Sequence, residues 1–206
     1  MKARFSQAFI VSATLAASVT AADAHIIASR LGDFYAGAVH PLTDLQDLIL
    51  WLAMGVLAGS LGAARGRWLV LVFPLGLLAG LVFGLSFGLV SARPAVDAAM
   101  ILMLGLLLAA AVRVPAVLLG ALAFGLAVMR GAANAADLAP ETNRTLFAAG
   151  LACAGYAAIT LTMALTLTFR RLDDGPSMTW RSVAIRAFGG WIAAIGLMMV
   201  GFALAS

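Results

Sequence analysis

The residues of this chain that could do chemistry are few, and most of them are acidic. The sequence contains two histidines, His25 and His40, one cysteine, Cys153, and nine Asp and Glu residues. Imidazole nitrogens suit Ni²⁺, Cu²⁺, Co²⁺ or Zn²⁺, and carboxylates add oxygen ligands. The sequence shows neither a nucleophile beside a base nor a phosphate-binding glycine loop, so it predicts no enzyme and no catalytic residue.

The first polar segment with candidate ligands covers residues 40–47. At 100° per residue, His40, Asp44 and Asp47 share one face of a helix, and Pro41 suits the first turn of that helix. The segment therefore offers one imidazole and two carboxylates on one side. An ordinary helix start explains Asp44 equally well, because acidic residues favour the first turn.

Two further segments add acidic residues. Asp97 follows Pro94, so it is either a helix cap or a carboxylate kept near the membrane for a function. In residues 130–137, Arg130, Asn134 and Asp137 recur at i, i+4 and i+7 and share one helical face. Arg130 and Asp137 are spaced to pair across two turns.

The composition of the chain is that of a membrane protein. The chain has 206 residues, of which 64% are hydrophobic and 11% charged, and its mean hydropathy is +1.06. Soluble domains carry about 25% charged residues. The net charge of +4 does not indicate a nucleic-acid partner, because no basic cluster is longer than Arg170-Arg171. We expect an all-α, polytopic membrane helix bundle.

The first residues have the pattern of a secretory signal peptide, residues 1–24. Lys2 and Arg4 precede an apolar stretch, and Ala22-Asp23-Ala24 has the A-x-A form of a cleavage site. The alternative is an uncleaved first helix over residues 5–22. Cleavage after Ala24 would make His25 the new N-terminus, where its amine and imidazole offer two nitrogen ligands.

Six later ranges are long enough to cross a bilayer, and joints rich in Arg, Pro or Gly separate them. They are 45–64, 68–91, 95–112, 114–130, 144–169 and 182–205. Six spans after an exported N-terminus place both termini outside, and more arginines then lie on the cytoplasmic side. We expect a bacterial inner membrane protein with periplasmic termini, in which all three polar segments meet at the outer face.

Side-chain patterns within the spans give further expectations. Gly76, Gly80, Gly84 and Gly88 line one helix face and predict close packing, either inside the bundle or between two copies of the chain. Threonines in the fifth span do not share one face, and helix-interior threonines usually bond back to their own backbone. Cys153 is expected as a small core residue. Several aromatic and Met residues are candidates for lipid or partner contact: Trp51, Trp68, Trp180, Trp191, Met198 and Met199.

Two of the polar segments resemble the motifs of a known family. His40-Pro-Leu-Thr-Asp-Leu-Gln-Asp-Leu resembles the His-Pro-x-x-Gly-x-Asp-His-x-Leu motif of the HupE/UreJ family, and Arg130-Gly-Ala-Ala-Asn-Ala-Ala-Asp resembles its His-Gly-x-x-His-Gly-x-Glu motif. These are hydrogenase and urease accessory membrane proteins regarded as nickel or cobalt permeases. The signal peptide, the six spans and the acid that opens the third span, Asp97, also fit.

The departures from these motifs change the ligand set. In the first motif, Asp44 replaces Gly, Gln46 replaces Asp, and Asp47 replaces the second His. In the second, both His positions are lost, to Arg130 and Asn134, and the Glu becomes Asp137. Nitrogen ligands favour Ni²⁺ over Mg²⁺ or Ca²⁺, so their loss matters. A fixed cation at position 130 repels a divalent metal unless Asp47 and Asp137 neutralise it.

The resemblance implies two functions of different kinds. The first is a Ni²⁺ or Co²⁺ permease that needs no bound cofactor and captures the ion on the periplasmic side through His25, His40, Asp47, Asp97 and Asp137. The second is an accessory or scaffold subunit that has lost the metal site. Its partners would be the lipid bilayer and a membrane complex, or a second copy bound through the face of Gly76, Gly80, Gly84 and Gly88.

Overall fold

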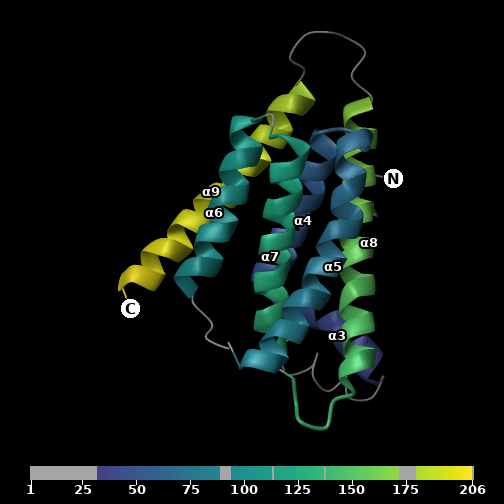
Figure 1. The fold of residues 1–206 in the computed structure, drawn as a ribbon. Helices are drawn as coiled ribbons and strands as arrows, with labels where there is room; N and C mark the ends of the chain where they lie inside the picture. The colour runs from purple at the N-terminus through teal and green to yellow at the C-terminus, as the bar shows by residue number, and fades with distance from the viewer. Residues whose placement is uncertain (1–31, 89–93, 113, 137, 172–179, 206) are drawn as a thin grey trace, which may run out of the picture.

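The described part of the chain is entirely helical. The computed structural model describes residues 32–88, 94–112, 114–136, 138–171 and 180–205. These residues form seven helices (Figure 1), namely α3 Asp33–Thr43, α4 Leu45–Ser60, α5 Ala63–Phe87, α6 Pro94–Ala110, α7 Ala116–Ala136, α8 Arg144–Arg171 and α9 Trp180–Ala205. The predicted signal peptide, 1–24, lies outside the described residues.

Each range predicted to span the membrane overlaps mainly with one helix, and the additional helix α3 precedes them. Two bounds differ most, because α5 begins at Ala63 and α7 continues to Ala136. Four helices, α5, α7, α8 and α9, are long and apolar enough to cross a membrane. Helices α3 and α4 pass that test only as a pair bent by 82°, and α6 is a shorter apolar helix. The structure thus agrees with a helical membrane protein, whereas six separate crossings remain a prediction.

The bend between α3 and α4 contradicts one expectation about the first polar segment. Pro41 lies inside α3, near its end, and does not start the next helix. Asp44 adopts an extended conformation and caps α4, with Oδ1 accepting a 2.8 Å hydrogen bond from the Gln46 backbone N–H. The expectation that His40, Asp44 and Asp47 share one helical face is wrong, because the helix restarts between them.

The glycine face of α5 packs inside the bundle. A Cβ at Gly80 would collide with the backbone of Val128 on α7, and Gly76 and Gly84 also face that helix. Because glycines let two backbones approach closely, α5 and α7 form one tight pair. Gly88 differs, since it ends α5 in a left-handed conformation with a φ of 59°. Packing within the chain therefore accounts for Gly76, Gly80 and Gly84.

Helix α4 packs on α8 through the same kind of contact. Gly55 lies against Thr162, and Gly59 lies against Thr166. The hydroxyl of Thr162 donates to the Ala158 carbonyl at 2.7 Å, and that of Thr166 donates to the Thr162 carbonyl at 2.8 Å. The expectation that these two threonines bond to their own helix is confirmed, and their methyl sides fill the space beside the glycines.

Helices α6 and α9 form a second tight pair. Gly105 of α6 faces Ala193, while Gly189 and Gly196 of α9 face the backbone of α6 near Ala109 and Leu102. Figure 1 shows this pair leaning away from the other helices toward the C-terminus. The described residues thus form two packed groups, α6 with α9 and the larger group of α3, α4, α5, α7 and α8.

Two arginines bind the C-terminal ends of α4 and α6, which have 16 and 17 residues. Arg170 of α8 donates to the carbonyl of Ser60 at the end of α4, and Nε of Arg186 on α9 donates to the Ala109 carbonyl of α6 at 2.9 Å. The last carbonyls of a helix have no partner within it, and its C-terminus carries partial negative charge. A cation therefore satisfies and stabilises each end.

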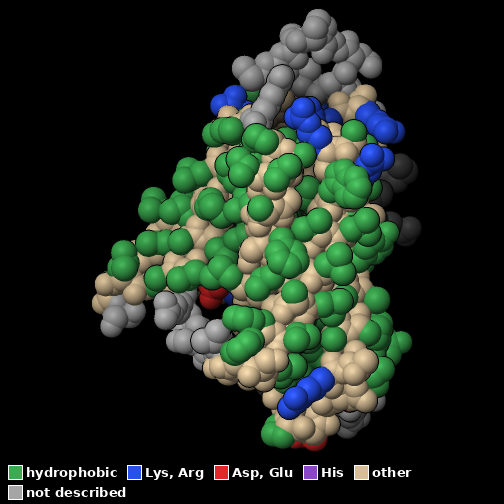
Figure 2. Space-filling model, in the orientation of Figure 1, with side chains coloured by type: hydrophobic (Ala, Val, Ile, Leu, Met, Phe, Trp, Pro, Cys, Tyr) green, Lys and Arg blue, Asp and Glu red, His purple; other side chains and the backbone are tan. Residues whose placement is uncertain are grey.

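Apolar side chains cover most of the visible surface, and basic side chains gather mainly at one end of it (Figure 2). Trp68, Trp180, Trp191 and Met198 are exposed, as expected for residues that contact lipid or a partner. Two expectations are wrong. Trp51 is buried against Phe73, and Cys153 is exposed on α8 instead of lying in the core.

Candidate functional site

The centre of the candidate site is the guanidinium of Arg130, which is buried in α7 with 3% of the residue exposed. Three carboxylates surround it. Nε lies 2.6 Å from Oδ1 of Asp47, and Nη2 lies 2.7 Å from Oδ2 of Asp44. Nη1 lies 3.2 Å from Oδ1 of Asp97. Arg130 therefore joins the start of α4, the start of α6 and the second half of α7.

Asn134, one turn after Arg130, completes the cluster. Its Nδ2 donates to Oδ2 of Asp47 at 3.1 Å and to the Arg130 carbonyl at 2.7 Å. Both oxygens of Asp47 are therefore hydrogen-bonded, as a fully buried carboxylate requires. The Oδ1 atom of Asn134 is buried and has no hydrogen-bond partner among the described residues.

Local structure explains why the carboxylates lie here. Asp44 is the N-cap of α4, Asp47 lies in the first turn of that helix, and Asp97 lies in the first turn of α6. The N-terminus of a helix carries partial positive charge and favours carboxylates. Helix-start chemistry and ion pairing with Arg130 therefore act together, so the two explanations of Asp97 and Asp44 are not exclusive.

The cluster carries more negative than positive charge. With all groups ionised, Asp44, Asp47 and Asp97 outnumber the single guanidinium. The three carboxylates differ in their access to solvent, because the side chain of Asp47 is 0% exposed, that of Asp97 16% and that of Asp44 37%. Figure 2 shows a hollow beside α6 with acidic and basic atoms at its floor. The partly exposed carboxylates are thus within reach of a cation from solution.

The structure brings together two of the five predicted ligands. Asp47 and Asp97 both bind Arg130. His40 lies in α3, where its ring packs beside Phe147 of α8 with centroids 6.0 Å apart. His25 and Asp137 lie outside the described residues. Within the described part of the chain, no group of three or more His, Cys, Asp or Glu residues is arranged to hold a metal ion.

The sequence singled out Arg130 but not its full set of partners. Asp47 was named only as one of two residues whose charge would have to neutralise Arg130 for a metal to bind, and the structure shows this ion pair. The pair with Asp44 was missed, because Asp44 was explained as a helix start, and so was the pair with Asp97. One signal could have found them, since an arginine in an apolar helix requires acidic partners on neighbouring helices.

Comparison with known proteins gives one match. The family model described as "HupE / UreJ protein" matches residues 13–199 and so covers most of the chain. Neither the curated proteins nor the solved structures contain a match.

Proposed function

The chain belongs to the HupE/UreJ family, whose members have accessory or transport roles for nickel or cobalt in membranes, and we propose that it is a Ni²⁺ or Co²⁺ permease. The ion is captured at the outer end of the bundle by the carboxylates around Arg130. His25, His40 and Asp137 supply further ligands. The ion is the transported substrate, and the proposal requires no resident cofactor.

The observation that carries this proposal is the excess of carboxylates over the one guanidinium. Unpaired negative charge near a membrane interior is costly, so such a cluster favours an additional cation. Asp97 makes the longest of the three ion pairs and is partly exposed. We expect it to be the carboxylate that moves from Arg130 to an arriving metal ion, while Asp47 stays bound to Arg130 and Asn134.

The arginine distribution supports a periplasmic position for the cluster in a bacterial inner membrane. Five exposed arginines lie at the other end of the helices, at the start of α5, the end of α8 and the start of α9. They are Arg65, Arg67, Arg170, Arg171 and Arg186. Cytoplasmic ends of membrane proteins carry an excess of Lys and Arg. This distribution supports a periplasmic side for the Arg130 cluster, and we propose that both termini lie on that side as well.

A specific observation also favours the second candidate, an accessory subunit without a metal site. Asp44, Asp47 and Asp97 already bind a guanidinium, which occupies the position that a metal ion needs. In this alternative, Arg130 replaces the metal permanently and holds α4, α6 and α7 together. The protein then acts through its lipid-facing and partner-facing surfaces in a membrane complex.

Uptake of radiolabelled nickel and cobalt separates the two candidates. Cells would express the wild type, the Asp97→Asn variant, the His25→Ala/His40→Ala variant, or Glu141→Gln as a control at an exposed acid, all at matched membrane levels. A permease predicts uptake above the empty vector that Asp97→Asn and the His variant reduce at least fivefold and Glu141→Gln leaves unchanged. Uptake by the wild type equal to that of the empty vector contradicts the permease.

A further inference from the structure

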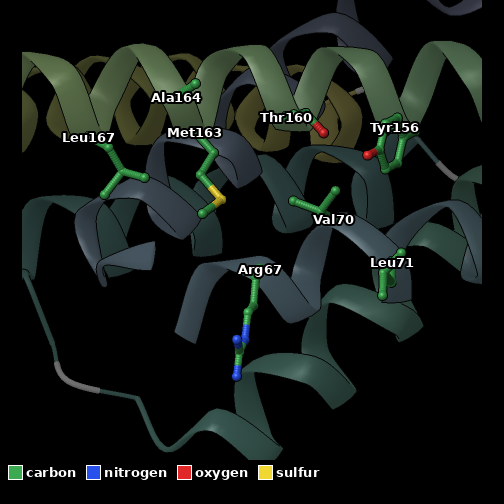
Figure 3. Close-up of a pocket in the computed structure, with 8 residues that line it drawn as sticks. All are labelled: Arg67, Val70, Leu71, Tyr156, Thr160, Met163, Ala164 and Leu167. Carbon is green, nitrogen blue, oxygen red and sulfur yellow. The ribbon is translucent and has the colours of Figure 1, made fainter. Parts of the chain in front are cut away.

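A groove of about 330 Å³ runs between α5 and α8, away from the Arg130 cluster. Its walls are mostly apolar, with Val70 and Leu71 from α5 and Met163, Ala164 and Leu167 from α8 (Figure 3). Both helices are long and apolar enough to cross the membrane. The groove therefore opens toward the region of the bilayer.

The length of the groove matches one half of a bilayer. Along α8, its lining extends from Tyr156 to Leu167, which at 1.5 Å per residue is about 17 Å. The hydrocarbon core of a bilayer is about 30 Å thick, so one leaflet contributes about half of that. An acyl chain of a single leaflet fits this length.

Polar groups break the apolar lining at two places. Tyr156 and Thr160 lie one turn apart on α8, and Figure 3 shows their hydroxyls directed toward one another. The Thr160 hydroxyl is buried and has no hydrogen-bond partner among the described residues. Thr162 and Thr166 of the same helix instead donate to their own backbone. Tyr156 and Thr160 mark the end of the groove that lies farthest from Arg67 along α8.

The second polar group is Arg67, which is exposed and lies at the edge of the groove, apart from the other labelled side chains (Figure 3). It is in the second turn of α5, and its guanidinium carbon lies 5.6 Å from the centroid of the Trp68 ring. Trp and Arg are typical of the interface between a membrane and water. A guanidinium there attracts and hydrogen-bonds a phosphate group.

We infer that this groove binds an anionic glycerophospholipid of the surrounding leaflet. Arg67 binds the phosphate at the arginine-rich end, and one acyl chain runs from there along Leu167, Met163 and Val70 toward Tyr156 and Thr160. The site is independent of metal transport, because no residue of the Arg130 cluster lines it.

Native mass spectrometry of the full chain in detergent, titrated with phosphatidylglycerol or phosphatidylcholine, tests this site. We expect the wild type to retain phosphatidylglycerol at least fivefold more strongly than phosphatidylcholine. Arg67→Gln should remove this preference. Arg65→Gln, a change at an exposed arginine of the same helix that does not line the groove, should keep it. Equal retention of the two lipids by the wild type, or loss of preference in both variants alike, overturns the proposal.

A second pair of variants tests the groove itself without changing charge. Ala164→Phe fills the groove, whereas Leu161→Phe places the same ring at an exposed position of α8 that does not line it. We expect Ala164→Phe to lower phosphatidylglycerol retention at least threefold and Leu161→Phe to leave it unchanged. Helical circular dichroism and gel filtration confirm that each variant is folded. If the folded Ala164→Phe variant retains phosphatidylglycerol as strongly as the wild type does, the proposed lipid site is wrong.

Discussion

Arg130 and Asp47 are 83 positions apart in the chain, yet Nε of Arg130 donates to Oδ1 of Asp47 at 2.6 Å in a buried environment. The pair joins α7 to α4, and Asn134 holds the second oxygen of Asp47. The cost of burying two charges is offset only if their geometry is good and their remaining atoms are hydrogen-bonded. Each partner therefore depends on the other, which makes this pair the most sensitive point of the cluster.

The first prediction concerns removal of the guanidinium. Arg130→Gln leaves Asp47 buried without its cation, and breaking a buried ion pair in this way costs about 3–5 kcal/mol. The free energy of unfolding in detergent, from denaturant titration, measures this loss. Arg144→Gln, at an exposed position at the start of α8, is the control and should change stability by less than about 0.5 kcal/mol. Equal stability of the two variants would show that the pair contributes nothing.

The second prediction compares two carboxylates on the same guanidinium. Asp47 is completely buried, whereas the Asp44 side chain is 37% exposed. Solvent weakens an exposed ion pair to about 0–1 kcal/mol. We expect Asp47→Asn to destabilise the protein by at least twice as much as Asp44→Asn, measured by the same denaturant titration. The reverse order would contradict the assignment of Asp47 as the inner partner.

The third prediction tests competition between Arg130 and a metal ion. Because the guanidinium repels divalent cations and occupies their ligands, Arg130→Gln should raise the affinity for Ni²⁺ at least tenfold, which corresponds to about 1.4 kcal/mol. Arg130→Lys keeps the charge and should leave the affinity low. Isothermal titration calorimetry of the folded variants measures both. No Ni²⁺ binding by the Arg130→Gln protein would favour the accessory role.

The fourth prediction uses the glycine face of α5. Gly80→Ala places a Cβ against the Val128 backbone and forces α5 away from α7. Overpacking of this kind costs about 1–3 kcal/mol. Gly125→Ala on α7 meets nothing within 4 Å and should be neutral or stabilising by up to about 1 kcal/mol, because Ala favours a helix more than Gly does. Thermal unfolding followed by circular dichroism separates the two, and similar melting of both variants would contradict the packing.

The fifth prediction concerns the arginine that caps α4. Arg170→Ala removes the donor to the Ser60 carbonyl and should cost about 0.5–1.5 kcal/mol. Its neighbour Arg171 is exposed at the end of α8, so Arg171→Ala is the matched control. Hydrogen exchange of the last turn of α4 should accelerate in the Arg170 variant alone. Equal hydrogen-exchange rates in the two variants would show that Arg170 does not stabilise the end of α4.

The sequence predicted the helices well because apolar length and polar joints determine them. The range 144–169, for example, coincides closely with α8, Arg144–Arg171. The sequence could not predict which side of each helix faces the core of the bundle. In a membrane helix apolar residues occur all round, so no periodicity separates core from lipid. This explains why Cys153 was assigned to the core and Trp51 to the surface, contrary to the structure.

The candidate site was predictable in its residue types but not in its pairing. The spacing of residues 130–137 drew attention to Arg130 and Asn134, and to Asp137 as a partner. The partners that the structure shows come from α4 and α6, and contacts between helices distant in the chain leave no local pattern. The break at Asp44 was also missed, because both an uninterrupted helix and a capped restart suit an acidic residue.

The two helices that supply the carboxylates are short, and this has a consequence for the bilayer. Helix α4 has 16 residues and α6 has 17, so they rise only about 24–26 Å, whereas the hydrocarbon core is about 30 Å thick. With their other ends held by Arg170 and Arg186 at the arginine-rich surface, they stop several ångströms short of the opposite one. Either the bilayer becomes thinner beside these two helices, or water fills the distance between their ends and the membrane surface. A hydrated cation would thus meet Asp97 below the level of the headgroups and begin to lose its water there.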